Sequence, residues 1–362
     1  MPGRLKKQGK SANTQPMTAQ EITKSNSEIT NSTETKAVAK EKWNWKPHKL
    51  TDVEKDRIKK FFMGSREKEG FLKQFVVYAL LICIGFIYLY PILYMLSSSL
   101  MTLDDLLDSS INWIPSSLNF KNYAQAGSSM NFWPVLGLSI IIAGVPTLLN
   151  VLSCSIVGYG LARFEFPGKK IMMGIIIFTF ILPSQVTMIP TYVLYSNLKI
   201  LSTLWAFVVP SLLAQGINAS IFILIFYQFF KQVPKVLIEA AQIDGAGYFK
   251  SFVRISLPSA APAILTVFLF SFVWYWNNSY LTRMYVSGVM TQSKWTTLVV
   301  QLQKFAANYN SYAQTEASGA VTLNESISMA GTMLSILPIL LMYFILQRYF
   351  VESIDRVGIT GE

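Results

Sequence analysis

Charged residues are absent from six long stretches of this chain, which are 75–103, 122–162, 171–198, 200–230, 255–282 and 326–347. Each stretch is long enough for a helix that crosses the membrane, since about 20 residues span about 30 Å of hydrocarbon. Only 14% of the residues are charged and 52% are hydrophobic, which excludes an ordinary soluble domain. The pattern predicts an all-α integral membrane protein with six transmembrane helices. The expected spans are about 75–99, 133–160, 171–192, 204–229, 260–281 and 327–348.

The lack of ionisable groups inside the spans also bears on the source of energy. A secondary transporter or proton pump normally keeps carboxylates, His or Lys at membrane depth to bind its coupling ion. A charge at the centre of a span costs roughly 2.5–3.5 kcal/mol on insertion scales, so it is kept only where it is used. We therefore expect another subunit to supply the energy. A channel remains possible in principle, although no filter-like repeat or ring of charges is visible.

Cysteine and histidine are scarce. Cys83 and Cys154 each fall inside an expected span, and His48 is the single histidine. These numbers predict neither a disulfide framework nor a metal site. Gly9-Lys10-Ser11 resembles the end of a phosphate-binding loop, but Arg4 stands where that motif needs glycine and no apolar strand precedes it. We expect a chain that is not an enzyme, binds no cofactor and is not itself an ATPase.

Positive charge is distributed unevenly. Of the 31 Lys and Arg residues, 17 lie in residues 1–73 and only five lie in alternate loops. The positive-inside rule then places both termini and the loop 231–258 in the cytoplasm. The opposite loops carry Asp104, Asp105 and Asp108, which we expect to be a solvated cluster on the outer side.

The chain outside the spans divides by composition. Residues 1–40 are polar with almost no aromatic side chains and are predicted to be a disordered cytoplasmic tail. Residues 41–73 contain Trp43 and Trp45 among lysines and a possible capping box at Thr51 and Glu54. This predicts an interfacial or partner-contacting helix, with a solvated linker helix as the alternative. The remaining parts are a transmembrane domain over 74–352 and a cytoplasmic tail over 353–362.

The loop 231–258 is a polar interruption between two apolar runs. Pro234 fits the first position of a short helix and Gly245 fits the position after its end. Small and apolar residues between them recur at helical spacing, so another surface could approach closely. A turn and a second helix that ends at Leu257-Pro258 are expected to follow.

This loop carries a resemblance to a known family. It has the pattern Glu-Ala-Ala, three residues, Gly, nine residues, Ile, one residue, Leu-Pro. The pattern resembles the cytoplasmic loop of the membrane subunits of bacterial binding-protein-dependent ATP-driven (ABC) importers, which docks in a cleft of the ATPase subunit. The residues that carry it, and that the resemblance implies contact the ATPase, are Glu239, Ala240, Ala241, Asp244, Gly245, Ile255, Leu257 and Pro258.

The fuller form of the loop is similar to the carbohydrate branch of that family, specifically the smaller permease of the maltose-transporter type. The segment 158–170, with its Ala-Arg-Phe and Pro-Gly pairs, also resembles these permeases. The resemblance implies a type I importer permease (MetI-like) fold with a cytoplasmic coupling helix, in the bacterial inner membrane. It also implies a second homologous permease, two ATP-binding subunits that hold ATP and magnesium, an extracellular or periplasmic solute-binding protein and a carbohydrate substrate.

Sugar pathways are lined by neutral hydrogen-bonding side chains and aromatic faces rather than by charges. Six residues in the spans suit such a pathway, namely Gln185, Gln215, Asn218, Trp274, Tyr275 and Asn277. Interfacial anchoring of Trp and Tyr and helix-to-helix bonding by Gln and Asn are the structural alternatives. Three functions stay open: a sugar importer permease, an importer permease for a non-sugar nutrient, and a membrane protein outside this family, which would be another transporter or channel or a non-transport protein such as a scaffold or an enzyme.

Overall fold

The structure is a computed structural model that describes residues 51, 64–65, 68–110, 113–287, 294–315 and 322–359. The chain divides into two compact units, residues 1–80 and 81–362. Most of the expected tail and of the interfacial helix region therefore lies outside the described residues, as do residues 360–362. The described part of residues 1–70 includes a two-stranded antiparallel hairpin of β1 (Gly64–Ser65) and β2 (Lys68–Glu69).

The remaining described elements are helices. In chain order they are α3 (Phe71–Ser99), α4 (Leu103–Leu107), α5 (Lys121–Ser129), α6 (Phe132–Arg163), α7 (Lys169–Ile181), α8 (Ser184–Asn197), α9 (Trp205–Leu212), α10 (Ala219–Gln232), α11 (Lys235–Ile243), α12 (Tyr248–Ser251), the π-helix η1 (Phe252–Ser256), α13 (Leu257–Ser259), α14 (Ala261–Asn277), α15 (Ser279–Leu281), the π-helix η2 (Thr282–Ser287), α16 (Leu298–Gln303), α17 (Phe305–Thr315) and α18 (Glu325–Ile359). The all-α expectation is confirmed apart from the hairpin.

Helix α6 lies at the centre of the unit 81–362 and contacts α9, α10 and α14. Its buried face carries small and polar residues, including Ser139, Thr147, Asn150 and Ser153, beside Ile142 and Cys154. Small residues at helix contacts in membranes allow backbones to approach, and this favours packing where lipid offers no hydrophobic driving force. At Gly158 the approach is so close that a Cβ would lie 2.6 Å from Phe226 Cβ on α10. The unit is therefore organised around one tightly contacted helix.

Among the described residues, three helices are long and apolar enough to cross a membrane alone, and three bent pairs pass the same test, which gives up to six spans. The bent pairs are α7 with α8, α10 with α11, and the segment 248–259 with α14, at angles of 103°, 72° and 77°. In the first two pairs the bend falls before a proline: Leu182 and Val233 are extended and precede Pro183 and Pro234. Proline disfavours the helical region in the residue before it, so these bends follow from the local sequence.

The third and fourth expected spans differ from the structure. Residues 171–192 were expected to form one span, but the chain bends at Leu182 and α8 runs on to Asn197. Residues 204–229 were expected to form one helix, but α9 ends at Leu212 and α10 begins at Ala219. Ala214 and Asn218 in the intervening segment have φ of 55° and 54°. A left-handed conformation at two non-glycine residues ends one helix and starts the next.

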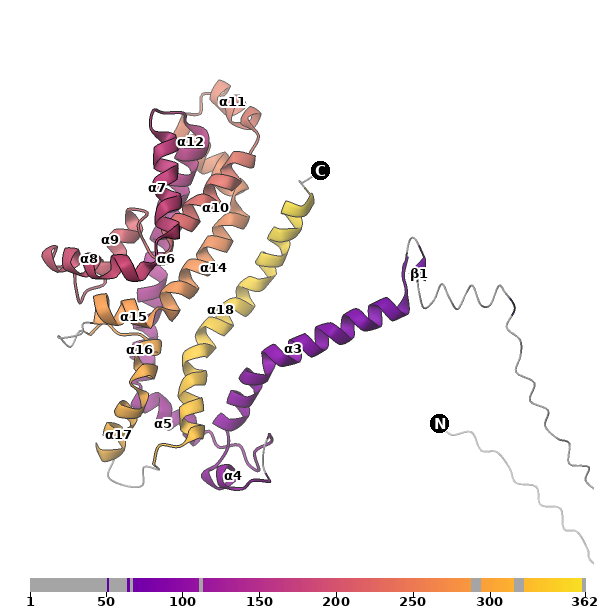
Figure 1. Cartoon of the computed structure of the whole chain (residues 1–362), viewed down its shortest axis with the longest axis vertical. Coiled ribbons are helices and arrows are strands. Elements are labelled where there is room, and N and C mark those ends of the chain that lie inside the picture. The colour runs from indigo at the N-terminus through magenta and orange to yellow at the C-terminus, as the bar shows by residue number, and fades with distance from the viewer. Residues whose placement is uncertain are drawn as a thin grey trace, which may run out of the picture. The chain divides into compact units, whose positions relative to one another are not determined.

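Two helices also end at residues other than the expected ones. The helix expected to stop at Leu257-Pro258 continues to Ser259, and its 77° bend with α14 falls at Ala260. The last helix continues to Ile359, through most of the expected tail 353–362. Within the unit 81–362, α11 and α12 lie at one end and α5 and α17 at the opposite end (Figure 1).

Candidate functional site

Helix α11 forms the expected short helix, and local interactions define both of its ends. Pro234 is the N-cap residue, one position before the expected one. At the other end the Gly245 N–H donates to Gln242 O at 3.0 Å and the Ala246 N–H donates to Ala241 O at 2.9 Å. This is the Schellman pattern of hydrogen bonds, which requires a left-handed residue after the helix, and Gly245 has φ of 80°. The position of Gly245 after the helix is confirmed.

The surface of α11 is open on most sides. Ile238 is its buried residue, while Glu239, Ala240, Asp244 and Gly245 are exposed and Ala241 is half-buried. Large apolar side chains are exposed around them, with Val236 at 71% and Ile243 at 87%. Ile255 and Leu257, further along the loop, are half-buried, and Pro258 is exposed. An exposed apolar helix face with one buried anchor is the form of a surface that a partner protein covers.

Aromatic rings at the end of α6 pack against the residues that flank α11. Tyr159, in the last turn but one of α6, lies 5.4 Å from the Phe230 ring on α10 and 4.8 Å from the Phe252 ring in η1, between ring centroids. Phe164 lies 5.2 Å from the Tyr248 ring. Aromatic pairs at such separations stabilise by about 0.5–1.5 kcal/mol beyond their burial. These contacts connect the end of α6 to the chain on both sides of α11.

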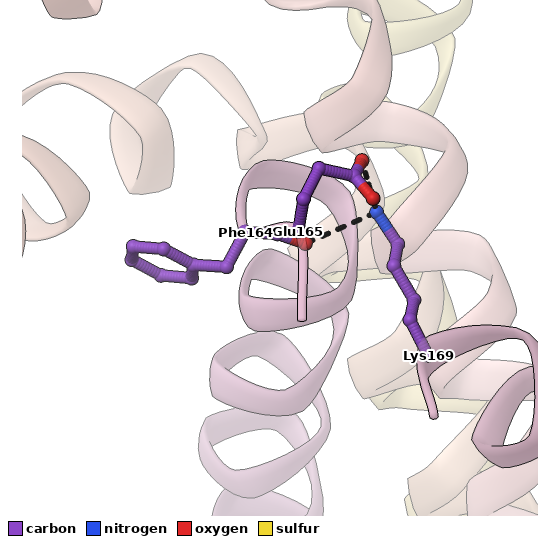
Figure 2. Close-up of polar contacts among 3 residues, drawn as sticks. All are labelled: Phe164, Glu165 and Lys169. Atoms are coloured by element: carbon purple, nitrogen blue, oxygen red, sulfur yellow. Dashed lines mark hydrogen bonds and ion pairs between the residues drawn. The ribbon is translucent and has the colours of Figure 1, made fainter. Parts of the chain in front are cut away.

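Two basic residues complete this region. Arg163 Nη2 donates to Val233 O, at the C-cap of α10, at 2.6 Å. Lys169 Nζ donates to Phe164 O at 3.1 Å and pairs with Glu165 Oε1 at 2.8 Å (Figure 2). The Lys169 hydrogen bond and charge, and then the more distant charge of Lys235, lower the pKa of Glu165. The Phe164 ring points away from this pair, which leaves it free to contact Tyr248 (Figure 2).

A cleft of about 300 Å³ opens where the broken α9–α10 segment meets the end of α14. Its lining is uncharged and comprises the aliphatic Ile217 together with six polar or aromatic residues, Asn218, Trp274, Asn277, Asn278, Ser279 and Tyr280. The structure thus brings together three of the six expected pathway residues. Ile217, Asn278, Ser279 and Tyr280 were not among the expected residues, although Asn278 directly follows Asn277 in the sequence.

Tyr275 does not line the cleft but lies buried behind it, with 1% of its surface exposed. Its hydroxyl lies 2.6 Å from Ser211 Oγ and accepts the Ile217 N–H at 3.1 Å. Asn150 Nδ2 donates to Ile217 O at 3.4 Å and Ser153 Oγ donates to Ser211 O at 2.6 Å. Non-helical backbone at membrane depth needs such partners, since lipid offers none. Tyr275 therefore holds the segment that forms one wall of the cleft.

The other two expected pathway residues lie elsewhere. Gln185 is exposed on α8, and Gln215 is exposed on the segment between α9 and α10, outside the cleft lining. Their roles stay predictions. Within the described residues, no group of three or more His, Cys, Asp or Glu side chains is placed to hold a metal ion.

The expected solvated acidic cluster is wrong for one of its members. Asp105 is 3% exposed and forms a capping box with Thr102 at the start of α4. Hydrogen bonds from the Ser116 hydroxyl and from the Thr102 backbone lower the pKa of Asp105. Asp104 and Asp108 are exposed, as expected.

Known proteins similar to this chain in sequence are transport permeases. Residues 154–356 match the family described as binding-protein-dependent transport system inner membrane component. The chain is 26% identical over 288 residues to the polygalacturonan/rhamnogalacturonan transport system permease protein YtcP of Bacillus subtilis, which covers 79% of this chain and 97% of that protein. It is 29% identical to the diacetylchitobiose uptake system permease protein NgcG of Streptomyces coelicolor, over 78% of this chain and 87% of that protein.

A solved structure shares the fold. It is the crystal structure of a bacterial ABC transporter involved in the import of the acidic polysaccharide alginate. The TM-score is 0.66 at 22% sequence identity, and the match covers 77% of this chain and 96% of the other. The expected permease fold is confirmed by this likeness together with the family match.

Proposed function

Since this chain belongs to the family of binding-protein-dependent transport system inner membrane components, we propose that it is the permease subunit of an ATP-driven importer for a carbohydrate. It forms half of the transmembrane pathway beside a second, homologous permease. Two ATP-binding subunits hold ATP and magnesium on the cytoplasmic side, and a solute-binding protein delivers the substrate outside. Both termini and α11 lie in the cytoplasm, and the chain has no catalytic site of its own.

The coupling part of this proposal is supported by the exposed helix α11, which follows a sharp bend at the end of α10 and precedes the bent segment 248–277. The residues matched by the family include α11. This short helix has defined ends, an exposed apolar face and alanine at positions 240 and 241. A partner that closes on ATP can seat such a helix in a cleft and displace it as one body. The bend of 72° between α10 and α11 turns the helix across the direction of the span, as a docking element requires.

The names of the relatives support a carbohydrate as cargo, because YtcP and NgcG are both named for saccharide transport. The cleft lined by Asn218, Trp274 and Asn277 supports it independently. Amide groups exchange hydrogen bonds with hydroxyls, and an aromatic face packs on a sugar ring, without a charge that would favour ionic cargo. We propose that the sugar contacts these three residues as it passes.

Uptake by cells that carry the whole transporter tests the cargo. The chain is expressed with its neighbouring permease, ATPase and binding-protein genes, and cells are given radiolabelled maltose, maltotriose, arabinotriose, galacturonate oligomers and a mixture of amino acids. Accumulation of one saccharide, lost when this chain is deleted, is expected. Accumulation of amino acids alone would instead assign a non-sugar importer, and failure to co-purify with an ATPase would exclude both.

Glu239→Lys tests the coupling surface. Glu239 is exposed, so the substitution should leave the folded chain in the membrane. A reversed charge on the docking face should abolish uptake while the amount of membrane-embedded protein stays unchanged. Lys250→Glu, an exposed charge reversal on the same loop beyond α11, is the control. Full uptake by Glu239→Lys would contradict the role of α11.

A further inference from the structure

The carboxyl end of α6 contacts the chain both before and after α11. Before α11, Arg163 donates to Val233 O at 2.6 Å, and Tyr159 packs on Phe230 with 5.4 Å between ring centroids. After α11, Tyr159 packs on Phe252 at 4.8 Å and Phe164 packs on Tyr248 at 5.2 Å.

These contacts constrain how α11 can move. Val233 is the extended residue that joins α10 to α11, so its carbonyl lies at the bend itself. A helix leaves its last carbonyls without partners, and a guanidinium that donates to one of them fixes the direction of the chain at that point. A displacement of α11 must then carry the end of α6 with it or break a charge-assisted hydrogen bond.

Helix α6 is also placed to pass the displacement on. It contacts α9, α10 and α14, and at Gly158 it lies against the backbone of α10 without room for a side chain. Nearer the start of α6, Asn150 donates to Ile217 O in the segment between α9 and α10, which lines the cleft, and Ser153 donates to Ser211 O at the end of α9. One continuous helix of 32 residues thus connects the α11 region to the cleft wall.

We propose that Arg163 is a positioning residue that fastens the α11 loop to α6, so that α6 moves with α11 during transport. This inference rests on the proposed function for its transport consequence. Its structural content, that Arg163 restrains the start of α11, does not depend on which solute is carried.

Three variants test the transport consequence. Arg163→Gln removes the charge from the donor, Arg163→Lys keeps it, and Lys170→Gln removes an exposed charge from the first turn of α7. Each is reconstituted with its ATPase, partner permease and binding protein, and uptake of the saccharide that the wild-type complex accumulates is divided by the ATP hydrolysed. We expect this ratio to fall about ten-fold in Arg163→Gln, with complex assembly unchanged, and to recover partly in Arg163→Lys. A ratio in Arg163→Gln equal to that of Lys170→Gln would overturn the inference.

A second measurement needs no substrate. Ile243, 87% exposed at the end of α11, is replaced by cysteine and nitroxide-labelled in the full chain in lipid nanodiscs, with Cys83→Ser to remove the exposed thiol and the buried Cys154 retained. Arg163→Gln should narrow the electron paramagnetic resonance lines, which reports a more mobile α11, and Lys170→Gln should not. Unchanged lines in Arg163→Gln would overturn the inference even if the ratio of uptake to ATP hydrolysis falls. Absence of wild-type uptake with narrowed lines would refute the proposed function while supporting the restraint by Arg163.

Discussion

Gly158→Ala tests whether α6 and α10 pack as closely as the structure has them. A methyl group on residue 158 would lie 2.6 Å from Phe226 Cβ, 3.0 Å from Tyr227 N and 3.2 Å from Ile223 O. Non-bonded carbons prefer about 3.5–4.0 Å, so the helices must separate by about 1 Å at this point. Two of the three neighbours are backbone atoms, so no side-chain rotation relieves the overlap. Overpacking of this kind costs about 1–3 kcal/mol.

Gly160→Ala is the matched control. It lies two residues further along the same helix, and a Cβ there meets nothing within 4 Å. Alanine in a helix interior is favoured over glycine by about 0.5–1 kcal/mol, so this variant should be as stable as the wild type or more stable. The purified complex is heated and its remaining monodisperse fraction is measured by size-exclusion chromatography. We expect a midpoint several degrees lower for Gly158→Ala, since 1 kcal/mol shifts Tm by about 2–4 °C in a domain of 150–250 residues. Equal midpoints for the two variants would refute the close packing.

Three further substitutions have defined outcomes in the same thermal assay or in uptake. Tyr275→Phe leaves the half-buried Ile217 N–H without its acceptor, which should cost about 1–3 kcal/mol and raise the KM for the sugar. Tyr280→Phe at the exposed rim should retain the wild-type midpoint. Gly245→Ala should cost about 1–2 kcal/mol because an L-residue disfavours the left-handed conformation, and Gly245→Asn should cost less. Uptake and a thermal midpoint in Gly245→Ala equal to those of the wild type would contradict the Schellman end of α11. Asp105 has a lowered pKa, so its contribution to stability is present above the ordinary value of 3.8 and is lost as the pH falls through its value in the folded protein. Asp105→Asn should therefore lower the midpoint at pH 7 and differ less from the wild type as the pH falls below 3.8; a difference that does not change with pH would contradict this.

The elements that sequence predicts best are those with local causes. The end of α11 at Gly245 follows from one residue type and two neighbouring hydrogen bonds. The bends at Leu182 and Val233 also have a local cause, because each residue precedes a proline. The bend at Leu182 was nevertheless missed, because an apolar stretch without charge predicts only that the segment is long enough to span. Proline alone is not a sufficient signal, since Pro146 and Pro338 lie inside unbroken helices.

The parts that sequence could not predict depend on contacts between distant residues. The segment between α9 and α10 is held by Tyr275 and Asn150, which lie on α14 and α6. The contact of Arg163 with Val233 joins residues 70 positions apart, and no local pattern at either residue indicates the other. Tyr275 was expected in the pathway because its residue type suits a sugar, but burial places it behind the cleft.

The most direct test of energy transfer through α11 is the number of saccharide molecules carried per ATP hydrolysed by the reconstituted complex with Ala241→Asp. Ala241 is half-buried on α11, and a carboxylate there would obstruct a close-fitting partner, whereas Ala241→Ser stays small and uncharged. We expect Ala241→Asp to remain in the membrane with a ratio near zero and Ala241→Ser to keep the wild-type ratio. A wild-type ratio in Ala241→Asp would contradict transfer through α11.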